Sequence, residues 1–232
     1  MNDQLIDCLE RYYNQFPVRW ERQKYIWKAV QTFQNNWNLR DSDLSEMIER
    51  STIDADYLMN HARYYPREMI ISLAEEQTDK VRYMFKELFD EKQDLASRAV
   101  NFIKTADKLR FSCTGKRYST NHQTMNAVST YLWLKYPSKY YFYKYTVAKR
   151  VSKETGIGFI GLGDVEVKKM ISAYSVMDQI SAEMRKDNRF RSLLDERLDS
   201  TLYPDESMHC MAMDFAFFIR PCYENKVRHT KA

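Results

Sequence analysis

The chain has 232 residues, of which 44% are hydrophobic and 29% are charged, and its formal net charge is +4. This balance excludes a disordered tail, and the length allows a sizeable core without disulfide or metal cross-links. Five glycines and five prolines provide few turns, so the composition favours long helices over a sandwich or barrel and predicts an all-α fold.

The N-terminal sequence and the most apolar segment indicate the compartment. Asp3 lies in an opening stretch, MNDQLIDCLERYY, that has no apolar core, which excludes a signal or transit peptide. The stretch from Met208 to Ile219 contains His209 and Asp214 and is much shorter than a bilayer span. We therefore expect a cytoplasmic protein with no transmembrane segment and no membrane partner.

Four cysteines, Cys8, Cys113, Cys210 and Cys222, are spread along the chain without a CxxC pair. A chain of this size does not need disulfides, so the pattern indicates buried free thiols in a reducing compartment. His209 beside Cys210 suggests zinc, but the spacing to Cys222 matches no finger or knuckle. No metal and no other cofactor is predicted.

Helical spacing of apolar residues dominates the first half of the chain. Pro17 suits the first turn of a helix, and the spacing after it predicts a helix over 18–37. Further helices are predicted to begin near Asp43, Pro66, Thr78 and Asp94. Methionine and aromatic stripes at this spacing are usually core, and here they include Trp20, Tyr25, Ile26, Ala29, Val30, Phe33, Trp37, Met69, Ile70, Leu73, Val81, Met84, Phe85, Leu88 and Phe89.

Charge is distributed unevenly along the sequence. Residues 108–153 contain ten lysine or arginine residues and no aspartate or glutamate, whereas residues 1–107 contain 15 basic and 19 acidic residues. A charge of +10 is therefore concentrated in 46 residues, and the rest of the chain is acidic. Such an asymmetry indicates an anionic partner.

Aromatic residues are interleaved with these cations. Lysine and arginine neutralise phosphates, and exposed rings stack on bases for roughly 1–3 kcal/mol each. Alternatively, Tyr131 and Tyr136 pack along a helix, while Tyr141, Tyr143 and Tyr145 alternate along a short strand whose other side carries solvating lysines. Residue types alone leave both interpretations open. We expect a small β element at 140–145.

Gly156, Gly158 and Gly161 form a GxGxxG sequence, and Asp178 follows near the distance expected of a ribose-binding acid. The dinucleotide fingerprint requires a strand before it and a helix that starts within it. Residues 146–154 have a helical pattern instead, which the glycines would end. We interpret 156–163 as a Gly-rich connection between a helical lobe at 1–155, which contains the basic segment 108–153, and a C-terminal helical lobe at 164–232.

Two further partial motifs point to enzymes but are incomplete. Gly115 and Lys116 are followed by Arg117, where a phosphate-binding loop requires serine or threonine. Glu166 and Lys168 have the ExK spacing of metal-dependent nucleases, but the separate strand carboxylate is missing. No catalytic residue is assigned, and the chain is not predicted to be an enzyme.

Four segments carry a family resemblance: YYPREMIISLAEE at 64–76, VRYMFKELFDEKQDLASR at 81–98, YLWLKYPSKYYFYKY at 131–145 and LYPDESMHCMAMDFAFFI at 202–219. In order and spacing they resemble the region that precedes the motor in McrB-type AAA+ restriction proteins. The resemblance covers most of residues 20–219, and the aromatic and basic YPSKYYFYKY block is its most specific element.

The resemblance implies a restriction system for modified or foreign DNA, in which a nucleotide-driven hexameric motor follows a variable N-terminal module that selects the target. The chain ends before any Walker A, Walker B or arginine-finger segment. We therefore expect an isolated targeting module, with an AAA+ motor in cis and a nuclease subunit as the implied partners. The resemblance does not decide whether this module reads DNA or contacts another subunit.

Two hypotheses about function follow from the local chemistry. The first is DNA binding, with cations at phosphates and tyrosines as a stacking or wedge surface; the residues assigned to it are Lys135, Lys139, Tyr140, Tyr141, Tyr143, Lys144, Lys149 and Arg150. The second is a protein-interaction adaptor that docks a nuclease partner or neighbouring protomers through exposed aromatic residues.

Overall fold

The computed structural model describes residues 2–59, 64–113, 120–161, 163 and 165–219. These residues form helices and no strand, which confirms the predicted all-α class. The helices are α1 (Asp3–Gln23), α2 (Tyr25–Asn36), α3 (Leu44–Thr52), the 3-10 turn η1 (Ile53–Ala55), α4 (Asp56–Met59), α5 (Pro66–Glu76), α6 (Thr78–Leu88), α7 (Leu95–Ser112), α8 (Met125–Lys135), α9 (Tyr145–Thr155), α10 (Glu166–Lys186), α11 (Asn188–Asp195) and α12 (His209–Phe218).

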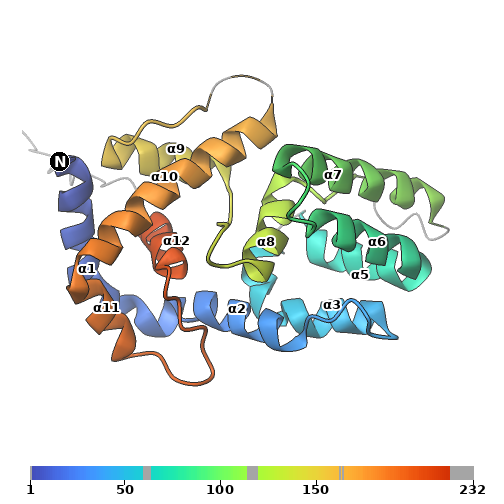
Figure 1. The fold of residues 1–232 in the computed structure, drawn as a ribbon, viewed down its shortest axis with the longest axis horizontal. Helices are drawn as coiled ribbons and strands as arrows, with labels where there is room; N and C mark the ends of the chain where they lie inside the picture. The colour runs from blue at the N-terminus through green and yellow to red at the C-terminus, as the bar shows by residue number, and fades with distance from the viewer. Residues whose placement is uncertain (1, 60–63, 114–119, 162, 164, 220–232) are drawn as a thin grey trace, which may run out of the picture.

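The helices pack as two groups that share one continuous core (Figure 1). One group contains α2 to α8, and the other contains α1 together with α9 to α12. Helices α7, α8 and α2 contact α10 and α12 where the groups meet. The boundary therefore differs from the predicted division at 156–163, because α1 and α9 lie with the C-terminal helices. No helix among the described residues has both the length and the apolar character of a bilayer span.

Helix α1 begins much earlier than the sequence predicted. Its side chain cap is Asn2, whose Oδ1 accepts from Leu5 N at 3.2 Å, and Pro17 lies inside the helix on its exposed side. The helix ends at Gln23 and α2 begins at Tyr25, so the single helix predicted over 18–37 is wrong. The stripe that holds α1 in place is buried at three- and four-residue spacing: Leu5, Cys8, Leu9, Tyr12, Phe16 and Trp20.

Several predicted helix starts are confirmed. Pro66 is the first residue of α5, and Asp94 caps α7 by accepting a hydrogen bond from Ser97 N at 2.8 Å. Thr78 is the first residue of α6 rather than its cap, because its hydroxyl donates backward to Ala74 O at 2.8 Å. For α5, α6 and α7, in contrast to α1, local sequence signals thus locate the helix start to within about one residue.

Gly156 ends α9 in the left-handed conformation, with φ of 69°. A Cβ at this position would lie 2.2 Å from Oε1 of Gln4, an exposed and flexible side chain that can move aside, so it is the left-handed backbone that favours glycine here. A helix precedes the glycines, and the next helix starts only at Glu166. This arrangement differs from the strand, tight turn and helix of a dinucleotide site.

The predicted β element at 140–145 is wrong. Residues 140–144 form no strand in the described part of the chain, and Tyr145 already belongs to α9. Side chains of α8 replace the missing strand: Tyr143 N donates to Ser129 Oγ at 2.8 Å, and Asn126 Nδ2 donates to Tyr143 O at 2.8 Å. The backbone N–H and C=O of Tyr143 are therefore satisfied without a sheet.

Two buried carboxylates fix the almost fully buried helix α12. Asp214 forms an ion pair with Arg19 Nη2 at 2.7 Å and accepts a hydrogen bond from the Tyr12 hydroxyl at 2.9 Å. Asp205 accepts from Cys210 N at 3.0 Å and Met211 N at 2.9 Å, and also from the indole of Trp27 at 3.3 Å. The two acids therefore tie α12 to α1 and α2.

Candidate nucleic-acid interface

Residues 136–144 connect α8 to α9 and cross between the two groups of helices (Figure 1). The three tyrosines assigned to base stacking lie in this connection, and all are buried: Tyr140 is 4% exposed, Tyr141 0% and Tyr143 3%. A buried ring cannot offer its face to a base. The prediction that these three tyrosines form a stacking or wedge surface is therefore wrong, and the alternative, that they are core, is confirmed.

Tyr140 joins the connection to the turn between α6 and α7. Its hydroxyl donates to Glu91 Oε1 at 2.8 Å and accepts a hydrogen bond from the buried guanidinium of Arg98, which pairs with Glu91 at 2.5 Å. Lys139 forms an ion pair with the same carboxylate, and this hydrogen bond raises the pKa of Lys139. The charge of Lys139 is thus compensated by an acid 48 positions away.

Tyr141 and Tyr143 contact the group of helices that contains α10 and α12. The Tyr141 hydroxyl donates to Asp178 Oδ1 at 3.0 Å, and its ring stacks on His209 with 4.2 Å between centroids. The Tyr143 hydroxyl donates to Glu166 Oε2 at 3.3 Å. Burial raises the pKa of both tyrosines, so both stay protonated as hydrogen-bond donors.

Two of the assigned cations serve the fold. Arg150 is half-buried and donates to Ala216 O at 3.2 Å, near the end of α12, where a cation opposes the negative end of the helix dipole. Lys135 is half-buried at the end of α8, and its Nζ lies 6.0 Å from the centroid of the Tyr136 ring.

The remaining assigned cations, Lys144 and Lys149, are exposed, and the structure adds Lys153 to them. Lys144 directly precedes α9, and the three exposed residues of that helix are Thr146, Lys149 and Lys153. Lys149 and Lys153 are one turn apart on the same face. Within the ranges that the structure describes, no carboxylate lies at ion-pair distance from any of the three lysines. We call Lys144, Lys149 and Lys153 the α9 lysines.

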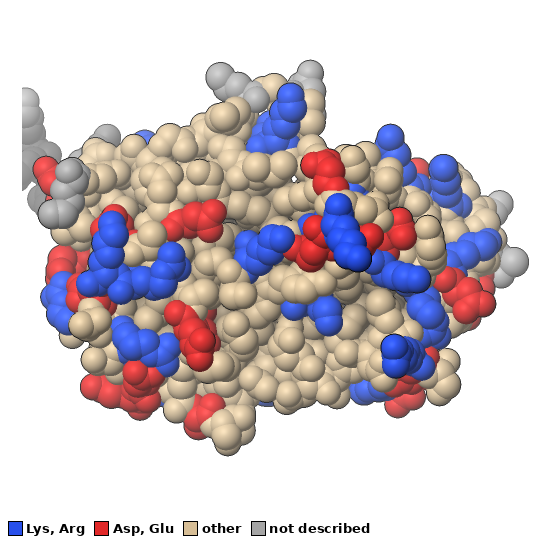
Figure 2. Space-filling view, in the orientation of Figure 1, with Lys and Arg blue, Asp and Glu red and all other residues tan. Residues whose placement is uncertain are grey.

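The basic segment of the sequence does not become a uniformly basic face. Figure 2 shows basic and acidic side chains interspersed over one side of the molecule. Arg110, like Lys139, belongs to the segment but is paired, with Asp107 at 3.0 Å. Acids outside the segment, Asp107 and Glu91, thus compensate part of its charge, and the α9 lysines form a smaller cationic surface than the sequence predicted.

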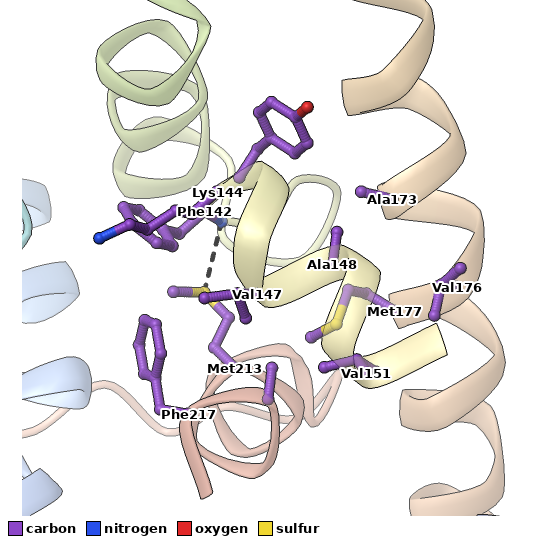
Figure 3. A pocket seen from close by; sticks show the side chains of 12 residues that line it. Phe142, Lys144, Val147, Ala148, Val151, Ala173, Val176, Met177, Met213 and Phe217 are labelled. Carbon is purple, nitrogen blue, oxygen red and sulfur yellow. Dashed lines mark hydrogen bonds between the residues drawn. The ribbon is translucent and has the colours of Figure 1, made fainter. Parts of the chain in front are cut away.

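An apolar cavity lies behind the α9 lysines, between α9, α10 and α12 (Figure 3). Side chains from the three helices converge on it, among them Val151, Met177 and Met213, and Phe142 N donates to Met213 Sδ at 3.5 Å. Its volume of about 20 Å³ accommodates roughly one water. The cavity is a packing defect behind the helix and is too small for a nucleotide cofactor.

The ExK residues do not come together as a nuclease site would require. Glu166 is the first residue of α10 and pairs with Lys169 at 2.9 Å, while Lys168 is exposed. No group of three histidine, cysteine, aspartate or glutamate side chains that could hold a metal occurs among the described residues. Cys8, Cys113 and Cys210 are buried free thiols, and Cys222, like Gly115 to Arg117, lies outside the described residues.

The sequence and fold of this chain have no match among known proteins: no family model, no curated protein and no solved structure matches it.

Proposed function

We propose that this chain is a non-catalytic DNA-targeting module that holds the phosphate backbone through the α9 lysines. The observation that carries the proposal is the α9 surface itself, on which Lys144, Lys149 and Lys153 are exposed without a carboxylate at ion-pair distance in the described ranges. A lysine that is already paired gains little from a phosphate, whereas a solvated one releases counterions from DNA on contact. This favours the α9 lysines over the paired cations of the basic segment, Lys139 and Arg110.

The character of the partner follows from the chemistry of this surface. The exposed side of α9 offers ammonium groups and the Thr146 hydroxyl, which suit phosphate oxygens and carry no base-specific pattern. Contacts of this kind fix position and orientation on DNA and do not select sequence. The resemblance to the targeting region of McrB-type restriction proteins supports DNA as the anion. In this proposal, a partner motor and a partner nuclease complete target choice and cleavage.

Charge reversal tests the proposal. Changing Lys144, Lys149 and Lys153 together to glutamate should weaken binding of labelled duplex DNA by at least about 100-fold at low salt, because phosphate contacts dominate such affinities. A matched control changes Lys86, Lys92 and Lys186 to glutamate, which alters net charge equally on other exposed positions. Fluorescence anisotropy gives the affinity, and circular dichroism shows that both variants remain helical. Equal loss in both variants would mean that net charge alone, and not the α9 surface, controls binding.

A second candidate function, the protein adaptor, is favoured by one apolar surface. Tyr57 is 85% exposed and Ile53 53% exposed, and the Tyr57 ring lies 5.8 Å from that of Tyr25. Exposed aromatic side chains of this kind act as anchors at protein interfaces. Binding through this surface would depend little on salt, whereas binding through the α9 lysines would weaken steeply with added salt.

A further inference from the structure

Helices α6 and α7 pack side by side in the group of helices that does not contain α9 (Figure 1). A groove runs along this pair. It has a volume of about 260 Å³, and Met84 and Phe102 reach it from the core. The polar side chains that line it are Tyr83, Glu87, Asn101, Lys104, Thr105 and Lys108. The groove is therefore much larger than the apolar cavity and is lined by hydrogen-bonding groups.

One face of α7 carries cations and amide or hydroxyl groups, and its middle part, Asn101, Lys104 and Lys108, lines the groove. Ser97, Asn101, Lys104, Lys108 and Phe111 follow each other at four- and three-residue spacing, and all five are exposed. Lys104 and Lys108 have no carboxylate at ion-pair distance in the part of the chain that the structure describes. Their Cα atoms are separated along the helix by about 6 Å, a rise comparable with the distance between adjacent phosphates of one strand.

Two exposed aromatic rings flank these lysines. Tyr83 on α6 is 60% exposed, and Phe111 at the end of α7 is 68% exposed. The guanidinium of Arg110 lies 4.0 Å from the centroid of the Phe111 ring. Neither ring is needed to fill the core, and such surfaces are suited to stacking on unpaired bases.

The acid that lines the groove is engaged by neutral partners. Glu87 accepts a hydrogen bond from Gln93 Nε2 at 3.2 Å and another from the Tyr83 hydroxyl. It forms no ion pair with Lys104 or Lys108 and leaves their charges available. A carboxylate in this position can also accept from an exocyclic amino group of a base.

We propose that the α6–α7 groove binds single-stranded nucleic acid, with Lys104 and Lys108 at consecutive phosphates and the rings of Tyr83 and Phe111 stacked on bases. A duplex does not fit this role, because its base faces are already stacked inside the helix. The inference rests on the proposed nucleic-acid function but places unpaired strands at a surface separate from the α9 lysines. Binding at this groove gives the module a preference for DNA that has been locally opened.

The test compares single and double strands on the same variants. Tyr83→Ala with Phe111→Ala should weaken binding of a labelled oligothymidylate of about 20 nucleotides at least about tenfold, because two stacking contacts are lost. Binding of a duplex should change by less than about twofold, because its phosphates contact the α9 lysines. Tyr83→Phe is the matched control, since it keeps the ring and removes only the hydroxyl, and it should retain single-strand affinity.

The outcomes separate the two proposals. Unchanged oligothymidylate binding in the double alanine variant would overturn the groove while leaving duplex binding by α9 intact. Loss of oligothymidylate binding in that variant, in a protein that binds no duplex, would support the groove and overturn the α9 proposal. An acidic peptide, polyglutamate, that displaces the oligonucleotide at equal charge concentration would show that the groove is a protein site and would also overturn the inference.

Discussion

Replacement of Asp205 by alanine is expected to lower the free energy of unfolding by at least about 3 kcal/mol, because each of three buried donors left without an acceptor costs roughly 1–3 kcal/mol. The donors are the backbone N–H groups of Cys210 and Met211 and the indole N–H of Trp27. Asp205 also has φ of 46°, a left-handed conformation that aspartate tolerates better than alanine. Urea denaturation followed by circular dichroism measures the loss. Asp199→Ala, an exposed acid of the same loop region, is the matched control and should remain close to wild type.

The contribution of Asp205 to the free energy of unfolding should also depend on pH, which tests its burial independently. Burial raises the pKa of Asp205 to about 6, although the N–H groups that donate to its carboxylate act in the opposite direction. A carboxyl with a higher pKa in the folded state stabilises the fold when protonated, so its contribution is present below about pH 4 and is lost as pH rises through about 6. The free energy of unfolding of wild type minus that of Asp205→Asn should therefore fall between pH 4 and pH 7. Burial lowers the pKa of His209 to about 4, which has the opposite effect on stability, but His209 is present in both proteins and cancels. A difference that is constant or rises with pH would contradict this.

The second large effect is expected at Asp214, where alanine should cost about 3–5 kcal/mol, the usual result of breaking a buried ion pair from one side. The carboxylate is 0% exposed, and its loss leaves the Arg19 guanidinium and the Tyr12 hydroxyl without their acceptor at the contact of α1 with α12. Asp195→Ala, which breaks the exposed pair with Arg191, serves as the control and should have a much smaller effect. A loss at Asp214 no larger than that at Asp195 would show that the pair does not hold α12 in place.

These buried acids show what a sequence pattern of this kind leaves out. Both lie in the segment 202–219 that carries the family resemblance, yet nothing in the residue types distinguishes Asp205 and Asp214 from solvated acids. Their partners Trp27, Arg19 and Tyr12 are 178 to 202 positions away. Only the packing of α12 against α1 and α2 brings these groups together, and the spacing of residues along the sequence does not predict that packing.

Helix content was predictable because its signals are local. Pro66, Asp94 and Gly156 mark helix ends through their own backbone or cap chemistry, and the periodic stripe of α6 is buried as expected. The prediction that Pro17 lies in the first turn of a helix is wrong because the signal there is not only local. The apolar stripe of α1 provides enough packing to carry the helix through a proline on its exposed side, so tertiary contacts override a local signal.

The candidate site was predictable in part. The absence of acids in 108–153 pointed to Lys144 and Lys149, which are exposed and have no carboxylate at ion-pair distance within the described ranges. The same count could not show that Lys139 meets Glu91, because that pair forms between the connection and a distant turn. The aromatic count likewise could not separate the buried Tyr141 from the exposed Phe111, since both lie among lysines and arginines in the sequence.

The steepness of the salt dependence tests the central claim most directly. Duplex affinity of the wild type, measured by fluorescence anisotropy between about 50 and 200 mM salt, should fall linearly on logarithmic axes. Changing the α9 lysines to glutamine should reduce the magnitude of that slope by about 2.7, because each lost phosphate contact removes about 0.9. A wild-type affinity that does not depend on salt, or a slope that is the same in both proteins, would contradict DNA binding through α9.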